Sequence, residues 1–166
     1  EVTNETTTVM LEAAVFNGPS IRRTAKALGM RSEASGRFER GVNHKYTAYA
    51  IDRAAQLLQQ ICPSCKVDVG IIDVYKNPVE QHTVTFTAKQ INDYLGTNIE
   101  KDEMVRILTA LEFVVTEEGD QLSALVPTWR GDVTVMPDIA EEVARIYNYD
   151  NIAPTIPVAV LSSGGM

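Results

Sequence analysis

Cysteine is scarce in this sequence, which excludes most sites built on several cysteines. The 166 residues contain two cysteines, Cys62 and Cys65, in the run Cys-Pro-Ser-Cys. A structural zinc site needs two more ligands than this pair supplies, and no thioredoxin-like pattern precedes it. A disulfide is not expected in a cytosolic protein. We therefore interpret the pair as part of a turn.

Long apolar runs and targeting segments are also lacking. Hydrophobic residues make up 45% of the sequence, but no run approaches the ~18–20 apolar residues of a membrane span. Residues 1–8 have no signal-peptide character. We expect a soluble, globular, cytoplasmic protein without a membrane partner. Its length allows one domain or two small ones, and either buries a useful core.

Basic residues are few in the second half. The net charge is −7, and residues 1–81 carry ten Lys or Arg against nine acids, whereas residues 82–166 carry five against thirteen. Nucleic-acid binding depends on Lys and Arg that neutralise phosphates, so the acidic half argues against generic binding of nucleic acid. The first half contains a basic cluster that fits either an RNA-facing surface or a solvated helix face: Arg22, Arg23, Lys26, Arg31, Arg37, Arg40, Lys45 and Arg53.

Local patterns in the first half predict two strands and two helices. A run of β-branched and apolar residues predicts a strand over 7–16, ended by Asn-Gly-Pro. A short capped helix is predicted over 21–28, and an amphipathic helix over 45–61. A second strand is predicted over 66–75. The Asn-Pro pair at 77–78 marks the predicted domain boundary.

The second half follows a pattern of six elements. Alternating residues predict a strand over 83–87, and apolar spacing predicts helices over 88–95 and 101–111. Strands over 113–116 and 122–126 are predicted to form a hairpin around a Glu-Gly-Asp turn. A final acidic helix completes the order β-α-α-β-β-α, which is winged-helix-like.

The acidic helix is predicted over 138–147, entered through Pro137, which the first turn of a helix tolerates. Its apolar stripe is predicted to face a core and consists of Ile139, Val143 and Ile146. The opposite face is predicted to carry Asp138, Glu141, Glu142 and Arg145. Asp132 lies just before the helix.

These carboxylates allow two interpretations. In the first, Asp138 and Glu141 complement the helix dipole in a pattern like a capping box. Arg130 and Arg145 then balance the remaining charge. In the second, a magnesium ion, which prefers oxygen ligands, turns the repulsion between Asp138 and Glu142 into coordination. Spacing alone does not decide between the two.

Glu12 and the small residues around Ala34 are the features of note in the first half. A carboxylate at Glu12 fits the wet face of a strand, whereas one held in a pocket accepts a hydrogen bond from a hydroxyl group. A pocket of that kind separates tyrosine from phenylalanine, because the wrong substrate leaves a polar group unpaired. The small residues of the run 32–41 fit close packing.

Two segments resemble one known family, the beta subunits of bacterial phenylalanyl-tRNA synthetases. They are the closing run 126–151, VPTWRGDVTVMPDIAEEVARIYNYDN, and the run 32–43, SEASGRFERGVN, which have the family's order and separation. The resemblance covers about Val9 to Pro157. It implies an α+β fold with three parts: the C-terminal part of an α/β tRNA-editing domain over 1–77, a winged-helix-like module over 78–157 and a linker over 158–166.

The resemblance also implies site residues. In this family the residues matching Glu12, Ser32 and Ala34 help to form the pocket that hydrolyses mischarged tyrosyl-tRNA, where the glutamate binds the tyrosine hydroxyl and the small residue leaves room for the ring. Ser32 stands where some members have threonine, and it keeps the hydroxyl. The family also binds a magnesium ion, shared with the alpha subunit, through the carboxylates matching Asp132, Asp138, Glu141 and Glu142.

The resemblance implies that the chain supports an enzyme. The parent enzyme, phenylalanine–tRNA ligase, is a heterotetramer of two alpha and two beta chains that charges tRNA(Phe) with phenylalanine, using magnesium and ATP bound by the alpha subunit. We expect neither aminoacylation nor editing by this chain alone. The expected partners are the alpha subunit, a second beta subunit and tRNA(Phe), but not DNA. The alternatives are a winged-helix-like nucleic-acid-binding module and a structural spacer.

Overall fold

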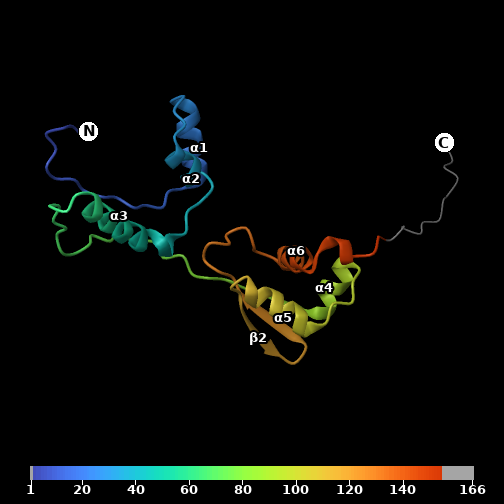
Figure 1. Ribbon diagram of the computed structural model, residues 1–166. Helices are drawn as coiled ribbons and strands as arrows, with labels where there is room; N and C mark the ends of the chain where they lie inside the picture. Colours follow the sequence, from blue (N-terminus) through green and yellow to red (C-terminus); the bar gives the residue numbers. More distant parts are fainter. Residues whose placement is uncertain (1, 155–166) are drawn as a thin grey trace, which may run out of the picture. The chain divides into compact units, whose positions relative to one another are not determined.

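The computed structural model describes residues 2–154, which fall into two compact units divided between Glu80 and Gln81 (Figure 1). The first unit is helical, and the second combines helices with a small sheet. The predicted linker over 158–166 lies outside the described residues. No helix in the described part of the chain is long and apolar enough to cross a membrane.

The first unit is built from short helices, and none of its described residues is buried. Its elements are α1 (Gly18–Ala27), α2 (Glu33–Phe38), the 3-10 helix η1 (His44–Tyr46) and α3 (Thr47–Ile61). The helices predicted over 21–28 and 45–61 are confirmed with different starting residues. Helix α2 was not predicted from the pattern of small residues.

Helices α1 and α2 pack against each other through a close approach at Gly18. Asn17 precedes α1, and its Oδ1 accepts a hydrogen bond of 3.0 Å from a backbone N–H of the first turn. A Cβ on Gly18 would lie 2.6 Å from the backbone oxygen of Glu39, so only glycine fits without a shift. The rings of Phe16 and Phe38 meet edge to face with centroids 4.8 Å apart.

The strands predicted over 7–16 and 66–75 do not form. Both runs lack regular secondary structure and pair with no strand among the described residues. Their apolar side chains are exposed; Met10 is 91% exposed and Ile72 is 89% exposed. Apolar and β-branched residues favour a strand only where they pack on a half-buried pleated surface beside a backbone partner. The prediction was wrong because a local pattern does not report whether such a partner exists.

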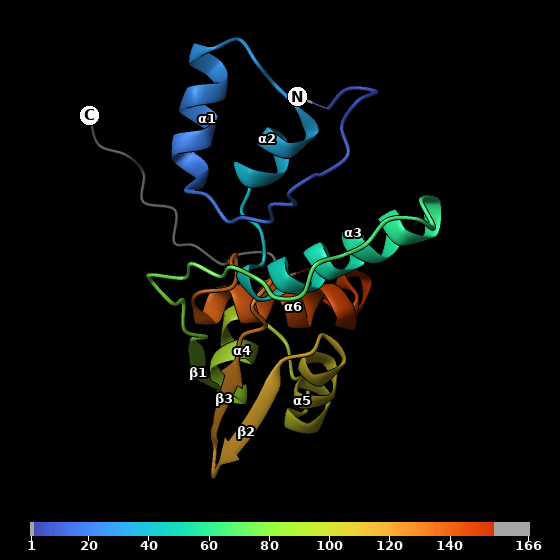
Figure 2. The same ribbon diagram turned by 90° about the vertical axis from the view of Figure 1, so that its left-hand side faces the viewer.

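The second unit has the element order β-α-α-β-β-α that the sequence predicts, which confirms the α+β class. Its elements are β1 (Thr83–Thr87), α4 (Ala88–Leu95), α5 (Lys101–Ala110), β2 (Val114–Glu118), β3 (Gln121–Leu125) and α6 (Met136–Tyr147), followed by the 3-10 helix η2 (Tyr149–Asn151). The sheet is antiparallel in the order β1-β3-β2. Figure 2 shows these strands side by side, with α6 running across the top of the unit.

The core of the second unit lies between the sheet and helices α4, α5 and α6. The residues that α5 contributes recur at helical spacing: Met104, Ile107 and Leu108 are each 0% exposed. The sheet and the other helices supply Val84, Phe86, Ile91, Leu122, Ala124, Ile139, Ala140 and Val143. Burying each large apolar side chain contributes roughly 1.5–3 kcal/mol to the stability of the fold. The first unit lacks such a core, because none of its described residues is buried.

Residues next to α4 in the sequence fix where this helix begins and ends. The hydroxyl of Thr87 accepts from the backbone N–H of Gln90 at 3.1 Å, and the side chain of Gln90 accepts in return from the backbone N–H of Thr87 at 2.8 Å. Gly96 ends the helix with φ 67°, the left-handed conformation that glycine adopts without strain. The amide of Asn92 then bonds both the N–H and the carbonyl of Ile99, at 2.8 and 2.9 Å, which fixes the turn into α5.

Candidate functional sites on the acidic helix and in the first unit

The loop between β3 and α6 brings Arg130 to the acidic helix. The N–H of Arg130 donates to the oxygen of Pro127 at 2.9 Å, and the N–H of Val133 donates to the oxygen of Arg130 at 3.3 Å. Val133 is 1% exposed, and its carbonyl oxygen lies 2.7 Å from His82 Nε2. The buried Val133 therefore anchors the loop, which sets the guanidinium of Arg130 beside α6.

Asp138 caps the start of α6. Its Oδ2 accepts hydrogen bonds from the backbone N–H groups of Thr134 and Val135, at 2.7 and 2.9 Å, and from the Thr134 hydroxyl at 3.2 Å. The bonds from these backbone groups lower the pKa of the Asp138 carboxyl, because they stabilise its charged form. The contacts of Asp138 therefore agree with the first interpretation of the sequence, in which this carboxylate caps the helix.

Glu142 is buried, and both of its carboxylate oxygens are paired with arginines. Its side chain is 7% exposed. Arg130 Nη2 donates to Oε1 at 2.8 Å, and Arg145 Nη2 donates to Oε2 at 2.6 Å. The hydrogen bond from Arg130, followed by that from Arg145, lowers the pKa of the Glu142 carboxyl, although burial acts in the opposite direction.

Arg130 joins Glu142 to Asp132. Its Nε and Nη2 donate to the two oxygens of Asp132 at 3.0 and 2.6 Å, a two-pronged contact that suits a planar guanidinium. The side chain of Arg130 is 21% exposed, whereas that of Asp132 is 65% exposed. The contact lowers the pKa of the Asp132 carboxyl, and the hydrogen bonds that Arg130 donates to Glu142 and then to Asp132 raise the pKa of Arg130.

Two predictions about the faces of α6 are wrong. Glu142 was expected on the exposed face but is buried, and Ile146 was expected to face the core but is 40% exposed. The side of α6 that faces the core carries Ala140 and Ala144 beside the predicted Ile139 and Val143. Small alanine side chains add to the buried face without a strong hydrophobic signal, so the sequence pattern placed that face incorrectly.

The four carboxylates implied as magnesium ligands do not form one group. The structure joins Asp132 to Glu142 through Arg130, while Asp138 bonds backbone amides and Glu141 forms no hydrogen bond or ion pair among residues 2–154. No cluster of three or more His, Cys, Asp or Glu residues in the described part of the chain is placed to hold a metal ion. As arranged here, these residues do not fit magnesium, which takes free carboxylate oxygens together with waters in near-octahedral geometry.

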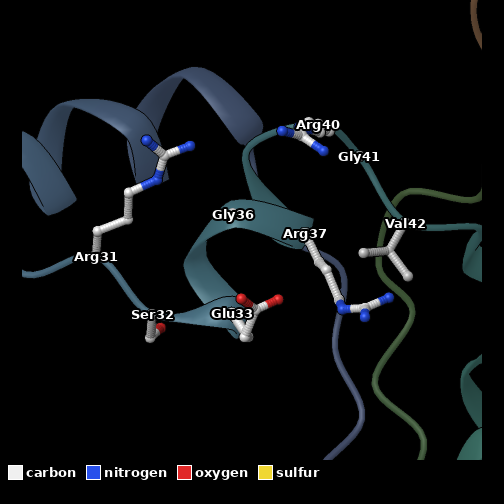
Figure 3. Close-up of a pocket in the computed structure, with 8 residues that line it drawn as sticks. All are labelled: Arg31, Ser32, Glu33, Gly36, Arg37, Arg40, Gly41 and Val42. Atoms are coloured by element: carbon white, nitrogen blue, oxygen red, sulfur yellow. The ribbon is translucent and has the colours of Figure 1, made fainter.

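The first unit contains an open hollow of about 710 Å³ around α2 (Figure 3). Its lining combines three arginines with small and polar residues: Arg31, Ser32, Glu33, Gly36, Arg37, Arg40, Gly41 and Val42. The arginines are placed around α2 and do not point to one common centre. Arg31 pairs with Glu39 at 3.6 Å. The hollow is thus a basic, solvated surface rather than a closed pocket.

The residues implied in the editing pocket are not gathered in this hollow. Ser32 lines it, but Glu12 and Ala34 do not. The hydroxyl of Ser32 accepts a hydrogen bond from the backbone N–H of Ser35 at 3.1 Å, and the hydroxyl of Ser35 accepts from the N–H of Ser32 at 2.9 Å, which caps α2. Glu12 is exposed and lies before α1. Their joint role therefore stays a prediction.

Two family models match the chain. Residues 84–149 match the tRNA synthetase B5 domain, and residues 1–63 match the B3/4 domain. The first match runs from β1 through α6, and the second covers the helices α1 to α3. Residues 1–63 are thus similar to a B3/4 domain and residues 84–149 to a tRNA synthetase B5 domain, in that order along the chain.

Curated relatives identify which synthetase the segment resembles. The chain is 41% identical over 164 residues to the phenylalanine–tRNA ligase beta subunit of Bacillus cereus (strain ZK / E33L), which covers 99% of this chain and 20% of that protein. It is 39% identical over 166 residues to the beta subunit of Bacillus subtilis (strain 168) and 42% identical over 166 residues to that of Geobacillus kaustophilus (strain HTA426), each covering 100% of this chain and 20% of the relative.

The chain thus spans about a fifth of the length of the curated relatives it matches. Over its whole length the chain is similar to an internal segment of bacterial phenylalanine–tRNA ligase beta subunits, which confirms the resemblance drawn from the two sequence motifs.

Proposed function

We propose that this chain is a working part of a phenylalanine–tRNA ligase beta subunit, and that it supports the ATP-dependent charging of tRNA(Phe) with phenylalanine. The observation that carries the proposal is an identity of 39–42% that runs through both units. A B5 domain placed in an unrelated protein would match over the second unit only. The ATP site and the aminoacylation chemistry belong to the alpha subunit in this proposal.

The first unit serves in the editing of mischarged tyrosyl-tRNA(Phe). The B3/4 match over residues 1–63 supports this role. Glu12 would accept the hydrogen bond of a tyrosine hydroxyl, Ser32 would line the pocket and Ala34 would leave room for the ring. Because Glu12 does not line the hollow that Ser32 lines, the pocket would be completed by other parts of the beta subunit, and the chain alone would not hydrolyse the ester.

The second unit contacts the alpha subunit through the exposed side of α6. Residues 82–166 carry thirteen acids against five Lys or Arg, an imbalance that favours a partner with a basic surface. The assembled ligase would be a heterotetramer in the cytoplasm, with a second beta subunit. Magnesium binding by Asp132, Asp138, Glu141 and Glu142 stays a prediction for that assembly, because their present contacts do not fit the ion.

Assembly of a chimera tests this function. The matching segment of the Bacillus subtilis beta subunit would be replaced by residues 2–154 of this chain and expressed with its alpha subunit. We expect a complex of two alpha and two beta chains by light scattering. A control chimera that lacks residues 81–154 should fail to assemble. A full chimera that is well folded but does not bind the alpha subunit would contradict the proposed contact.

A second candidate function, RNA binding by the first unit, is favoured by the arginines around the hollow. Arg37 and Arg40 are exposed, and their side chains form no hydrogen bond or ion pair within the described residues. Replacing both arginines with glutamine should weaken the binding of tRNA at low salt, measured by filter binding. Replacing Lys89, an exposed residue of the acidic second unit, with glutamine gives a second variant that controls for loss of charge alone. Binding that is equal in both variants, or insensitive to salt, would contradict this candidate.

A further inference from the structure

Glu142 is the one charged residue that is buried among residues 2–154, at 6% exposed. A buried carboxylate is costly unless it is paired and hydrogen-bonded, so its partners must be supplied by the fold. Arg145 lies on the same helix and its side chain is 47% exposed, whereas Arg130 comes from the loop before the helix and is 21% exposed. Arg130 is therefore the partner that shares the buried environment of Glu142.

The guanidinium of Arg130 bridges two carboxylates that come from different segments. Its Nη2 lies 2.6 Å from Asp132 Oδ2 and 2.8 Å from Glu142 Oε1. A planar guanidinium with five donors can serve both carboxylates at once. Arg130 and Arg145 carry two positive charges, and Asp132 and Glu142 carry two negative charges. The four side chains therefore form a neutral network.

Each carboxylate oxygen of this network accepts a hydrogen bond from an arginine. Both oxygens of Asp132 accept from Arg130, and the two oxygens of Glu142 accept from Arg130 and Arg145. A magnesium ion that bridged Asp132 and Glu142 would need the position between them that the guanidinium holds, and it could not lie against that positive charge without displacing it. An arginine bound in this way therefore competes directly with a metal ion.

We propose that Arg130 is the resident cation of this acidic cluster. It fills the place between Asp132 and Glu142 that a divalent ion would need, and it fastens the loop of residues 127–135 to α6. Magnesium binds the cluster only after the guanidinium has left. The inference depends on contacts within the second unit alone and does not rest on the proposed function.

The experiment compares Arg130→Met with Arg145→Met in the full chain. Each variant removes one of the two arginines that bond Glu142, but only Arg130→Met also removes the partner of Asp132. Tm would be measured by circular dichroism with and without millimolar magnesium chloride, with calcium chloride and sodium chloride as controls for metal type and ionic strength. Isothermal calorimetry with magnesium would report binding directly.

We expect the Tm of the unsubstituted chain to be unaffected by magnesium, with no saturable heat. Arg130→Met should lower Tm by several degrees, more than Arg145→Met does, and magnesium should restore part of the loss. Saturable magnesium binding by the unsubstituted chain that Glu142→Gln abolishes would overturn the proposal. An Arg130→Met variant that is as stable as the parent, or that is destabilised but does not respond to magnesium, would overturn it equally.

A double variant covers the case in which Arg130→Met does not fold. Arg130→Met with Glu142→Met removes the buried carboxylate together with its partner, and replacing a buried ion pair by apolar groups is often neutral for stability. Recovery of a cooperative melting transition in the double variant would support the pairing. Failure of the double variant to recover would show that Arg130 acts through something other than the carboxylate.

Discussion

At the scale of single residues, the carboxylates of the second unit have different tasks although they lie close together in the sequence. Asp138 bonds backbone amides, Glu142 bonds two arginines, and the side chain of Glu141 forms no hydrogen bond or ion pair within the described residues. A pattern of four acids is therefore not evidence of four equivalent ligands. The partner of each carboxylate decides what the residue does.

The capping role of Asp138 predicts an asymmetric effect on stability. Asp138→Ala removes the acceptor for two backbone N–H groups at the start of α6, so we expect Tm to fall by a few degrees. Glu141→Ala is the matched control, one turn further along the same helix, and should leave Tm nearly unchanged. Thermal melting of both variants checks the prediction, and equal effects would argue against the cap.

The pairing of Glu142 predicts sensitivity to acid. Because the folded protein holds the pKa of Glu142 below its usual value of 4.5, the pairing contributes fully above about pH 4.5 and is lost as the pH falls through the lowered pKa. Urea unfolding between about pH 6 and 3 should show stability falling with pH. Glu142→Gln cannot titrate, so its stability should change less over the same range. Identical pH profiles would contradict the ion pairing.

At the scale of elements, locally determined features could be predicted and features that need distant partners could not. The helix over 88–95 and the start of the next helix at Lys101 follow from caps, apolar spacing and the glycine at position 96, which all lie within a few residues. The runs 7–16 and 66–75 carry strand-like residues but find no partner in the described chain. Pairing between strands is a non-local event that composition does not report.

The same distinction holds for the candidate site. The start of α6 near Pro137 and the cap by Asp138 could be predicted, because both concern neighbouring residues. The burial of Glu142 could not, since its partner Arg130 lies twelve residues away and reaches it only through the fold of the loop. The sequence indicates that Arg130 balances acidic charge, but not which carboxylate it meets.

The contact between α1 and α2 yields a prediction for the first unit. Gly18→Ala places a Cβ 2.6 Å from the backbone oxygen of Glu39, so the two helices must separate at a cost of about 1–3 kcal/mol. Gly36→Ala is the control, because a Cβ there meets no atom within 4 Å and alanine favours the helix. Amide exchange should accelerate in α1 of the first variant only. Equal exchange in both would contradict the close approach.

At the scale of the whole molecule, the two units differ in whether they contain a buried core. The second unit has a buried core formed by its sheet and helices, whereas no described residue of the first is buried. The second unit therefore has a core of its own, and the described residues of the first unit do not form one.

The rate of tRNA(Phe) charging by the chimeric beta subunit tests the central claim most directly. With residues 2–154 in place of the native segment and the native alpha subunit present, we expect phenylalanylation within about tenfold of the parent enzyme, since the proposed function assigns the aminoacylation chemistry to the alpha subunit. A well-assembled chimera that does not charge tRNA(Phe) would contradict the assignment of this chain to a phenylalanine–tRNA ligase.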